Sequence, residues 1–200
     1  MLRRFRARHV AVLLGALVAG GALVGVVVAA QAGQPVPQGL AAAIANEPLV
    51  KVLDLPDASG APSRSMFVQP TSAGFLCMWD APNALSRMRQ GGCNPSDDPL
   101  AGRSISGSLA YDGGPAIDRV DDARLIGLAV ADTARIHVEM SDGTIRTVKL
   151  KKTKAGSNEF QAFGYRFKKQ DLKNGIGPIA IVAFDANGVE VGRQPTGIGG

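Results

Sequence analysis

Short segments in which apolar and polar residues alternate constrain the fold of this 200-residue chain more than any other feature. Gly and Pro residues separate the segments, and this pattern is typical of an all-β antiparallel sandwich or barrel. The expected strands span residues 49–55, 65–69, 74–80, 104–111, 124–130, 135–140, 144–150, 159–167, 178–184 and 189–193. Residues 83–90 depart from the pattern and are predicted to form a helical turn or two, with Asn83 as the cap and Gly91 as the stop.

The strongest local prediction is a hairpin at Asp142-Gly143. This dipeptide suits a two-residue type I′ turn, which opposes Met140 to Ile145. In that register Val148 falls on the polar face of the hairpin. We therefore expect a β-bulge near Thr147 that turns Val148 back toward the core.

A second hairpin is predicted to turn at residues 185–188. A shorter, two-residue loop would place Asp185 opposite Glu190, and two like charges in that position are unfavourable. A four-residue loop instead opposes Phe184 to Val189, and we prefer this arrangement.

The N-terminus carries a basic flank followed by a long apolar run. Four arginines lie among the first eight residues, residues 10–30 carry no charge, and no acidic residue occurs before Glu47. This arrangement is typical of an export signal, a hydrophobic helix that places the downstream chain on the outer side of a membrane.

The apolar run admits two interpretations. A spanning helix needs roughly 20 apolar residues, so the length of residues 10–30 favours a retained single-pass anchor with the domain outside. The tripeptide Ala30-Gln31-Ala32 also fits signal peptidase, with cleavage after Ala32 and secretion of the remainder. Within the run, Gly21 and Gly25 have the G-x-x-x-G spacing at which two helices approach closely.

We divide the chain into three parts. Residues 1–32 form the signal or anchor helix, and residues 33–48 form a Pro- and Ala-rich tether in which the Ala-rich stretch makes one short helix. Residues 49–200 form the exported β-sandwich domain, which ends in a short disordered tail.

The cysteine content fits an exported domain. Cys77 and Cys93 are the two cysteines, and an oxidising exterior predicts a disulfide between them. The bridge closes a short loop, a constraint of about 3 kcal/mol in the chain-entropy model. Their spacing, with no histidine nearby, excludes a zinc site. Trp79 shares a strand face with Phe75 and Cys77 and is expected in the core.

The charge distribution excludes nucleic acid as a partner, although the sequence pI is about 9.5. The four leader arginines belong to a total of 22 basic residues, so 18 remain from residue 33 on, against 17 acidic residues. The exported part is therefore nearly neutral, and it lacks the interleaved aromatic and basic residues on which bases stack. We interpret the lysines of residues 149–154 and 168–173 as a solvated face.

An acidic loop, residues 112–122, is the candidate for metal binding. Its carboxylates offer the oxygen ligands that calcium prefers, but their spacing is not that of an EF-hand, and Arg119 lies among them. We interpret it as an ordinary acidic loop. The carboxylates in question are Asp112, Asp118, Asp121 and Asp122.

The exported part contains a single histidine, His137, on a predicted strand between Arg135 and Glu139. Nucleophilic catalysis needs a base held beside a nucleophile, and no Ser or Cys lies at a strand-to-helix elbow here. We expect His137 to be an exposed strand residue.

A family resemblance is carried by residues 125–140, by the turn Asp142-Gly143-Thr144 and by residues 182–188. Together these segments resemble small exported β-sandwich proteins of actinobacteria, over roughly residues 65–195. The resemblance implies an immunoglobulin-like antiparallel β-sandwich. It supplies no catalytic or ligand residues, because a shared fold does not carry function with it.

The sequence therefore predicts an exported, membrane-anchored cell-envelope protein that acts as a non-enzymatic binding or structural module. We assign no catalytic, cofactor-binding or metal residues, because no convergent set of titratable groups is visible. The expected partner is a protein or a cell-wall component, with the N-terminal helix in the membrane. The alternative is an extracytoplasmic enzyme or metal-dependent module that uses residues 112–122.

Overall fold

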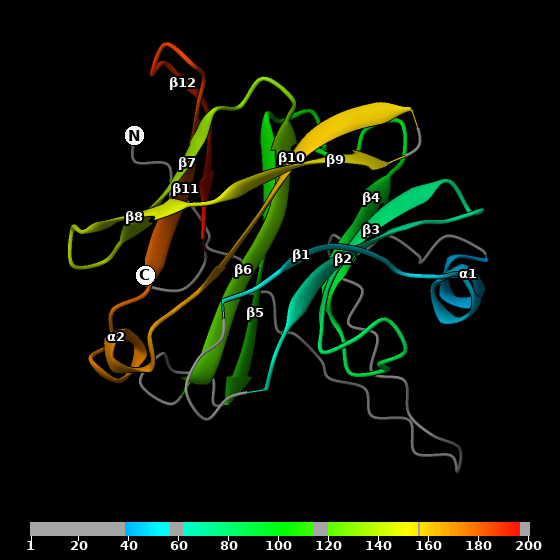
Figure 1. Cartoon of the computed structure of the whole chain (residues 1–200), viewed down its shortest axis with the longest axis horizontal. Helices are drawn as coiled ribbons and strands as arrows, with labels where there is room; N and C mark the ends of the chain where they lie inside the picture. The colour runs from blue at the N-terminus through cyan, green and yellow to red at the C-terminus, as the bar shows by residue number, and fades with distance from the viewer. Residues whose placement is uncertain (1–38, 57–61, 114–119, 156, 197–200) are drawn as a thin grey trace, which may run out of the picture.

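A computed structural model describes residues 39–56, 62–113, 120–155 and 157–196 (Figure 1). These residues form three four-stranded antiparallel sheets and two short helices, so the predicted all-β sandwich is confirmed. The predicted leader, residues 1–32, lies outside the described residues, as do the first part of the tether and the C-terminal tail. Within the described ranges, no helix is long and apolar enough to cross a membrane.

The first sheet, sheet A, is a meander of four consecutive strands in the order β1-β2-β3-β4. The strands are β1 (Val50–Asp54), β2 (Ser65–Pro70), β3 (Phe75–Ala81) and β4 (Gln90–Pro95). Helix α1 (Leu40–Asn46) packs on one face of this sheet through Leu40 and Ile44. The expected helix in the Ala-rich stretch is therefore present, and it belongs to the folded unit.

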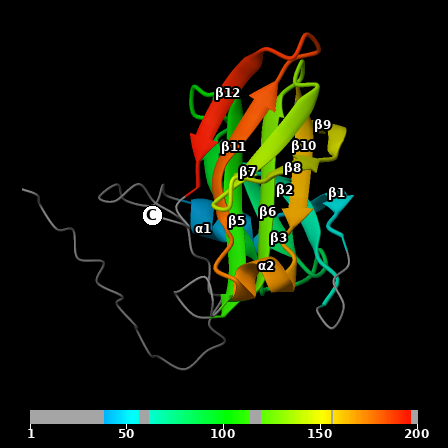
Figure 2. The same cartoon turned by 90° about the vertical axis from the view of Figure 1, so that its left-hand side faces the viewer.

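The other two sheets are built from the remaining eight strands. Sheet B has the order β5-β6-β10-β9, and sheet C has the order β12-β11-β7-β8. The strands of sheet B are β5 (Ile105–Gly113), β6 (Val120–Val130), β9 (Leu150–Ala155) and β10 (Asn158–Arg166). Those of sheet C are β7 (Arg135–Met140), β8 (Ile145–Val148), β11 (Pro178–Phe184) and β12 (Glu190–Pro195). Helix α2 (Lys169–Lys173) follows β10, and Figure 2 looks onto sheet C with α2 at one end.

Sheet B is the middle layer, with sheet C on one side and sheet A on the other (Figure 1). Leu125 of β6 belongs to the apolar cluster shared with sheet C, whereas its neighbour Ile126 belongs to the cluster shared with sheet A. Because both faces are covered, nearly every residue of β6 is buried. This explains why residues 125–130 of β6 are apolar without a polar face.

The hairpin at Asp142-Gly143 forms, but the predicted register is wrong. Glu139, not Met140, lies opposite Ile145, and Met140 accepts a hydrogen bond from Gly143 and donates one to the Thr144 carbonyl. Only Gly143 is left-handed, with φ of 78°, so the loop is a three-residue turn rather than type I′.

This one-residue shift has two consequences for the side chains. Val148 lies opposite Ile136 and is buried without the predicted bulge at Thr147, while Ile145 moves to the exposed face. A shift of one residue reverses the face of every side chain on the strand.

The second hairpin repeats the same loop. Asp185 donates to the Val189 carbonyl and accepts a hydrogen bond from Gly188, whose φ is 81°. Phe184 therefore lies opposite Glu190, and the preferred four-residue loop opposing it to Val189 is wrong.

The predicted helical turns over residues 83–90 are also wrong. A hydrogen-bonded turn at Asn83 occupies the start of this segment, and Gln90 begins β4. The turn forms because the Asn83 side chain accepts a hydrogen bond from the Leu85 amide, which is a local alternative to helix capping.

We predict that Gly91 and Gly92, neighbours on β4, respond differently to substitution by Ala. A Cβ on Gly91 would lie 1.8 Å from the Met78 carbonyl oxygen, whereas a Cβ on Gly92 would meet no atom within 4 Å. Gly91→Ala should lower the free energy of unfolding by about 1–3 kcal/mol, and Gly92→Ala should leave it nearly unchanged. Urea denaturation of the two variants checks this, and equal losses would contradict the packing.

Candidate functional site

Six charged side chains form a largely buried group between sheets A and B, which we call the ion cluster. It contains three arginines and three aspartates, so its formal charge is zero. Its members are Arg64, Asp80, Asp112, Asp122, Arg124 and Arg166. Asp80 belongs to sheet A, and Arg124 to the middle strand β6 of sheet B.

Arg124 is the hub of the ion cluster, and its side chain is fully buried. Its Nε donates to Asp80 Oδ2 at 2.8 Å, and its Nη1 donates to Asp112 Oδ2 at 2.9 Å and also to Asp122 Oδ2. Arg64 reaches two of these three carboxylates, at 3.2 Å from Asp112 and 3.6 Å from Asp80. One guanidinium therefore holds carboxylates from both sheets.

Asp122 receives a second, two-pronged contact from β10. Arg166 Nε donates to Oδ1 at 2.9 Å, and Arg166 Nη2 donates to Oδ2 at 2.6 Å. Such paired hydrogen bonds fix the geometry of an arginine–carboxylate contact as well as strengthening it. Gln90 of β4 completes the outer end of the cluster by donating to Asp112 Oδ1.

The two innermost carboxylates respond oppositely to this environment. Burial raises the pKa of Asp80, against the attraction of Arg124 and Arg64. Burial acts in the same direction on Asp122, but hydrogen bonds from Arg166 and the charge of Arg124 outweigh it and lower the pKa of that carboxyl. The cluster is thus a structural ion network in which each buried charge faces an opposite one.

The acidic loop, residues 112–122, contributes the residues at its two ends to the ion cluster. Asp112 and Asp122 direct their carboxylates toward arginines, while Asp118 lies outside the described residues. Asp121 is exposed and lies 3.9 Å from Lys169. Among the described residues, no three His, Cys, Asp or Glu side chains gather as metal ligands.

The ion cluster was not predicted from the sequence, although one signal was available. Arg124 directly precedes an apolar stretch, residues 125–130, that has no polar face, and a charge in such a strand is buried only when it is paired. Its partner Asp80 was not identifiable, because that residue lies 44 residues earlier on another sheet.

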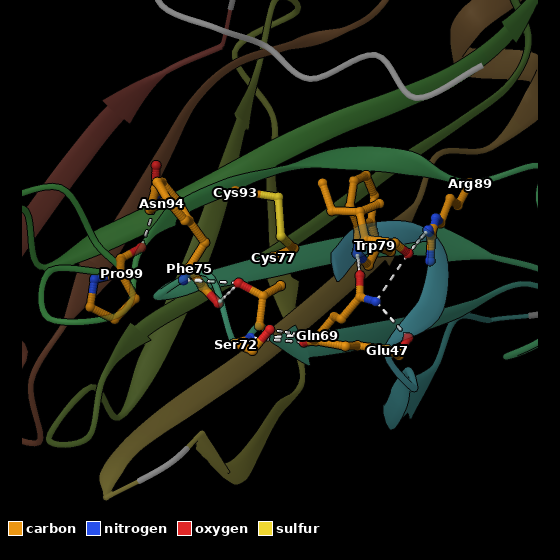
Figure 3. The surroundings of a disulfide bond; sticks show 12 residues. Glu47, Gln69, Ser72, Phe75, Cys77, Trp79, Arg89, Cys93, Asn94 and Pro99 are labelled. Carbon is orange, nitrogen blue, oxygen red and sulfur yellow. Dashed lines mark hydrogen bonds between the residues drawn. A yellow bond between two sulfur atoms is a disulfide. The ribbon is translucent and has the colours of Figure 1, made fainter. Parts of the chain in front are cut away.

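The Cys77–Cys93 disulfide is present, as predicted (Figure 3). It joins residues directly paired across β3 and β4, so it lies within sheet A rather than between two sheets. Trp79 lies on the same face and is fully buried, which confirms its expected place in the core.

Around Trp79, two polar side chains fasten the end of helix α1 to sheet A (Figure 3). Gln69 accepts a hydrogen bond from Trp79 Nε1 and donates to the carbonyls of Ile44 and Glu47. Arg89 donates to the Ile44 carbonyl and lies over the Trp79 ring, 4.9 Å from its centre. These donors satisfy carbonyls that a helix C-terminus leaves unpaired.

His137 is only half-buried, and its ring centre lies 4.9 Å from that of Phe184. Burial and the charge of Arg135 lower the pKa of His137, against the opposing charge of Glu139. Its cross-strand neighbours are Thr147 and Val182. The imidazole is therefore packed among cross-strand neighbours of sheet C, and it is half-buried rather than exposed as expected.

A groove of about 470 Å³ lies where edge strands of all three sheets meet. Strand β1 is an edge of sheet A, β9 an edge of sheet B and β8 an edge of sheet C, and each contributes residues to the groove. Its lining is mainly apolar, with Lys149 and Lys151 as its cationic residues. The lining residues are Leu53, Asp54, Pro56, Thr147, Val148, Lys149, Leu150, Lys151, Gly164 and Tyr165.

Comparisons with known proteins add nothing to these assignments. No family model, curated protein or solved structure matches the chain. The interpretation of the ion cluster and the groove therefore depends on their geometry.

We predict that Arg124→Met destabilises the domain by about 3–5 kcal/mol, because it leaves buried Asp80 with only the more distant Arg64. The control is Arg193→Met, which removes a half-exposed arginine that also contacts two carboxylates, Glu139 and Glu190. This control should cause a far smaller loss. Urea denaturation of both variants tests the comparison, and similar losses would contradict the structural role of the ion cluster.

The lowered pKa of Asp122 predicts a loss of stability in acid. Its contribution is present above pH 3.8, the ordinary value for Asp, and is lost as the pH falls through the lower folded value. Asp80 changes the stability in the opposite direction. Because its pKa is raised in the folded protein, its protonation stabilises the fold as the pH falls. As the pH falls from 5 to about 2, the urea midpoint of the unsubstituted protein should fall. We therefore expect the midpoint to fall less steeply in Asp122→Asn and more steeply in Asp80→Asn. An NMR titration of the Asp122 carboxyl carbon gives a direct readout, and a midpoint above 3.8 would contradict the assignment.

Proposed function

We propose that this chain is an exported cell-envelope protein, held in the membrane by residues 10–30, whose β domain binds a partner without catalysing a reaction. The basic flank and apolar run support export. The Cys77–Cys93 disulfide supports an oxidising compartment outside the cytosol.

We further propose that strands β5 to β12, residues 105–195, form an immunoglobulin-like unit. The strand orders β5-β6-β10-β9 and β12-β11-β7-β8 support this, since they correspond to A-B-E-D and G-F-C-C′ of such domains. Sheet A is then an addition on the outer face of the A-B-E-D sheet, and the disulfide belongs to that addition. The likeness to exported actinobacterial proteins is part of the same proposal and rests on the sequence motifs.

The observation that carries the binding function is the groove at the three sheet edges. Edge strands offer unpaired backbone groups to an added strand, and the apolar lining offers contacts for alternate side chains. Lys149 and Lys151 outnumber the one carboxylate of the lining, that of Asp54, and favour a ligand that carries negative charge. The partner that fits these features is an extended, acidic and partly apolar segment of another protein.

The alternative, a metal-dependent enzyme using residues 112–122, draws no support from the contacts of this loop. The carboxylates of Asp112 and Asp122 accept hydrogen bonds from arginines, and both are committed to the ion cluster. A binding domain is the better interpretation of the geometry.

We test the groove with a photocrosslinking amino acid at exposed Thr147, incorporated in the full chain in its native cells. We expect a crosslinked adduct whose added mass is removed by protease, as a protein partner requires. In the variant Lys149→Glu/Lys151→Glu, the yield of this adduct should fall to a small fraction. The matched control, Lys168→Glu/Lys169→Glu, reverses two exposed lysines outside the groove and should retain the adduct. A crosslinker at exposed Ile179 serves as the position control. Equal adducts at Thr147 and Ile179, or none, would contradict the proposal.

A further inference from the structure

We infer that the loop between β3 and β4, residues 82–89, is a membrane-contact loop that inserts Leu85 and Met88 into the outer leaflet of an anionic lipid membrane. This inference rests on the proposed anchoring of the chain. It adds a second contact with the same membrane, made by the folded domain itself.

The first observation is the exposure of two apolar side chains in this loop. Leu85 is 94% exposed and Met88 is 77% exposed, the highest values among the exposed large hydrophobic residues of the described chain. The next most exposed, Val189, reaches 58% in a hairpin of sheet C. Apolar side chains that protrude this far together mark a contact surface.

Hydrogen bonds within the loop hold these side chains outward. The Leu85 amide donates to Asn83 Oδ1 at 3.0 Å, and the Ser86 amide donates to the Asn83 carbonyl at 3.2 Å. The Met88 amide donates to Ser86 Oγ at 3.1 Å. The polar groups thus satisfy one another inside the loop, and the apolar side chains remain on its outer side.

The charge of the loop fits an anionic surface. The exposed Arg87 supplies the cation of the loop, whereas Arg89 is turned inward onto Trp79 and α1, and no acidic residue occurs between Asp80 and Asp97. Apolar side chains that enter the lipid, combined with cations at the level of the headgroups, are typical of segments that lie in a membrane interface. A surface of this composition is complementary to anionic phospholipid.

The position of the loop places it close to the proposed anchor. Arg89 donates to the Ile44 carbonyl of α1, so the loop is fastened to the first described helix. Eight uncharged residues, 31–38, separate the apolar run from Gly39. A chain of this length reaches at most about 30 Å, so Gly39 at the start of α1 stays within that distance of the bilayer surface, and the loop fastened to α1 stays near it.

The test uses Leu85→Trp in the full chain, reconstituted in vesicles of phosphatidylcholine and phosphatidylglycerol. Brominated phosphatidylcholine quenches indole rings that reach the acyl chains. We expect a blue shift and strong quenching for Leu85→Trp, with Trp79 as a buried background in every sample. The matched control is Ile145→Trp, at an exposed apolar position in a hairpin of sheet C, and it should show neither effect.

Charge reversal tests the lipid class. Arg87→Glu, combined with Leu85→Trp, should reduce the quenching in vesicles that contain phosphatidylglycerol and leave it unchanged in phosphatidylcholine alone. Quenching of Leu85→Trp that is no greater than that of Ile145→Trp, in a chain that co-sediments with the vesicles, overturns this inference and leaves the anchor standing. A chain that does not co-sediment overturns the anchor and the inference together. An indole at position 85 that is shielded from water but not quenched by lipid indicates a protein partner and also overturns the inference.

Discussion

At strand β6 the middle sheet is covered on both faces, and this constraint governs most of the structure. Sheet C covers one side of sheet B through the cluster around Leu125, and sheet A covers the other through the cluster around Ile126. A polar group on β6 must therefore find its partner inside the protein, because leaving it unpaired costs free energy that a domain of this size cannot spare. Arg124 satisfies that condition by contacting aspartates on both sides of the interface.

The same layering separates the buried polar contacts from the groove that we propose as the binding site. In the interior, the ion cluster pairs each charge with an opposite one. Gln69 and Arg89 donate hydrogen bonds to the carbonyls at the end of α1. At the margins, where the covering sheets end, the edge strands β1, β8 and β9 leave a groove with Lys149 and Lys151. The features suited to recognition therefore lie where the layers stop rather than within them.

The periodicity of the sequence predicted most strands, and the bounds of β7 (Arg135–Met140) and β11 (Pro178–Phe184) agree with it at both ends. It did not predict β4, whose Gly, Gln and Asn residues have low strand propensity, or β9, which is rich in lysine. The hairpin register was wrong because two- and three-residue loops differ in the backbone conformation of Asp142, not in composition. Local rules also could not supply the contact of Asp80 with Arg124, because these two residues meet only through the stacking of sheet A on sheet B.

The connectivity of the sheets dictates an order of assembly as the chain emerges from its N-terminal end. Sheet A joins only consecutive strands, so its pairing is complete once Pro95 is available, and the disulfide forms across its last two strands. Sheet C is different, because β7 pairs with β11 across some forty intervening positions, and Gln194 on β12 bonds to Gly107 on β5. Long-range pairings of this kind form slowly. The growing molecule consequently exposes the apolar side of sheet A, including Met66 and Met78, until β6 and β10 arrive, and that interval is when it is most in need of protection from aggregation.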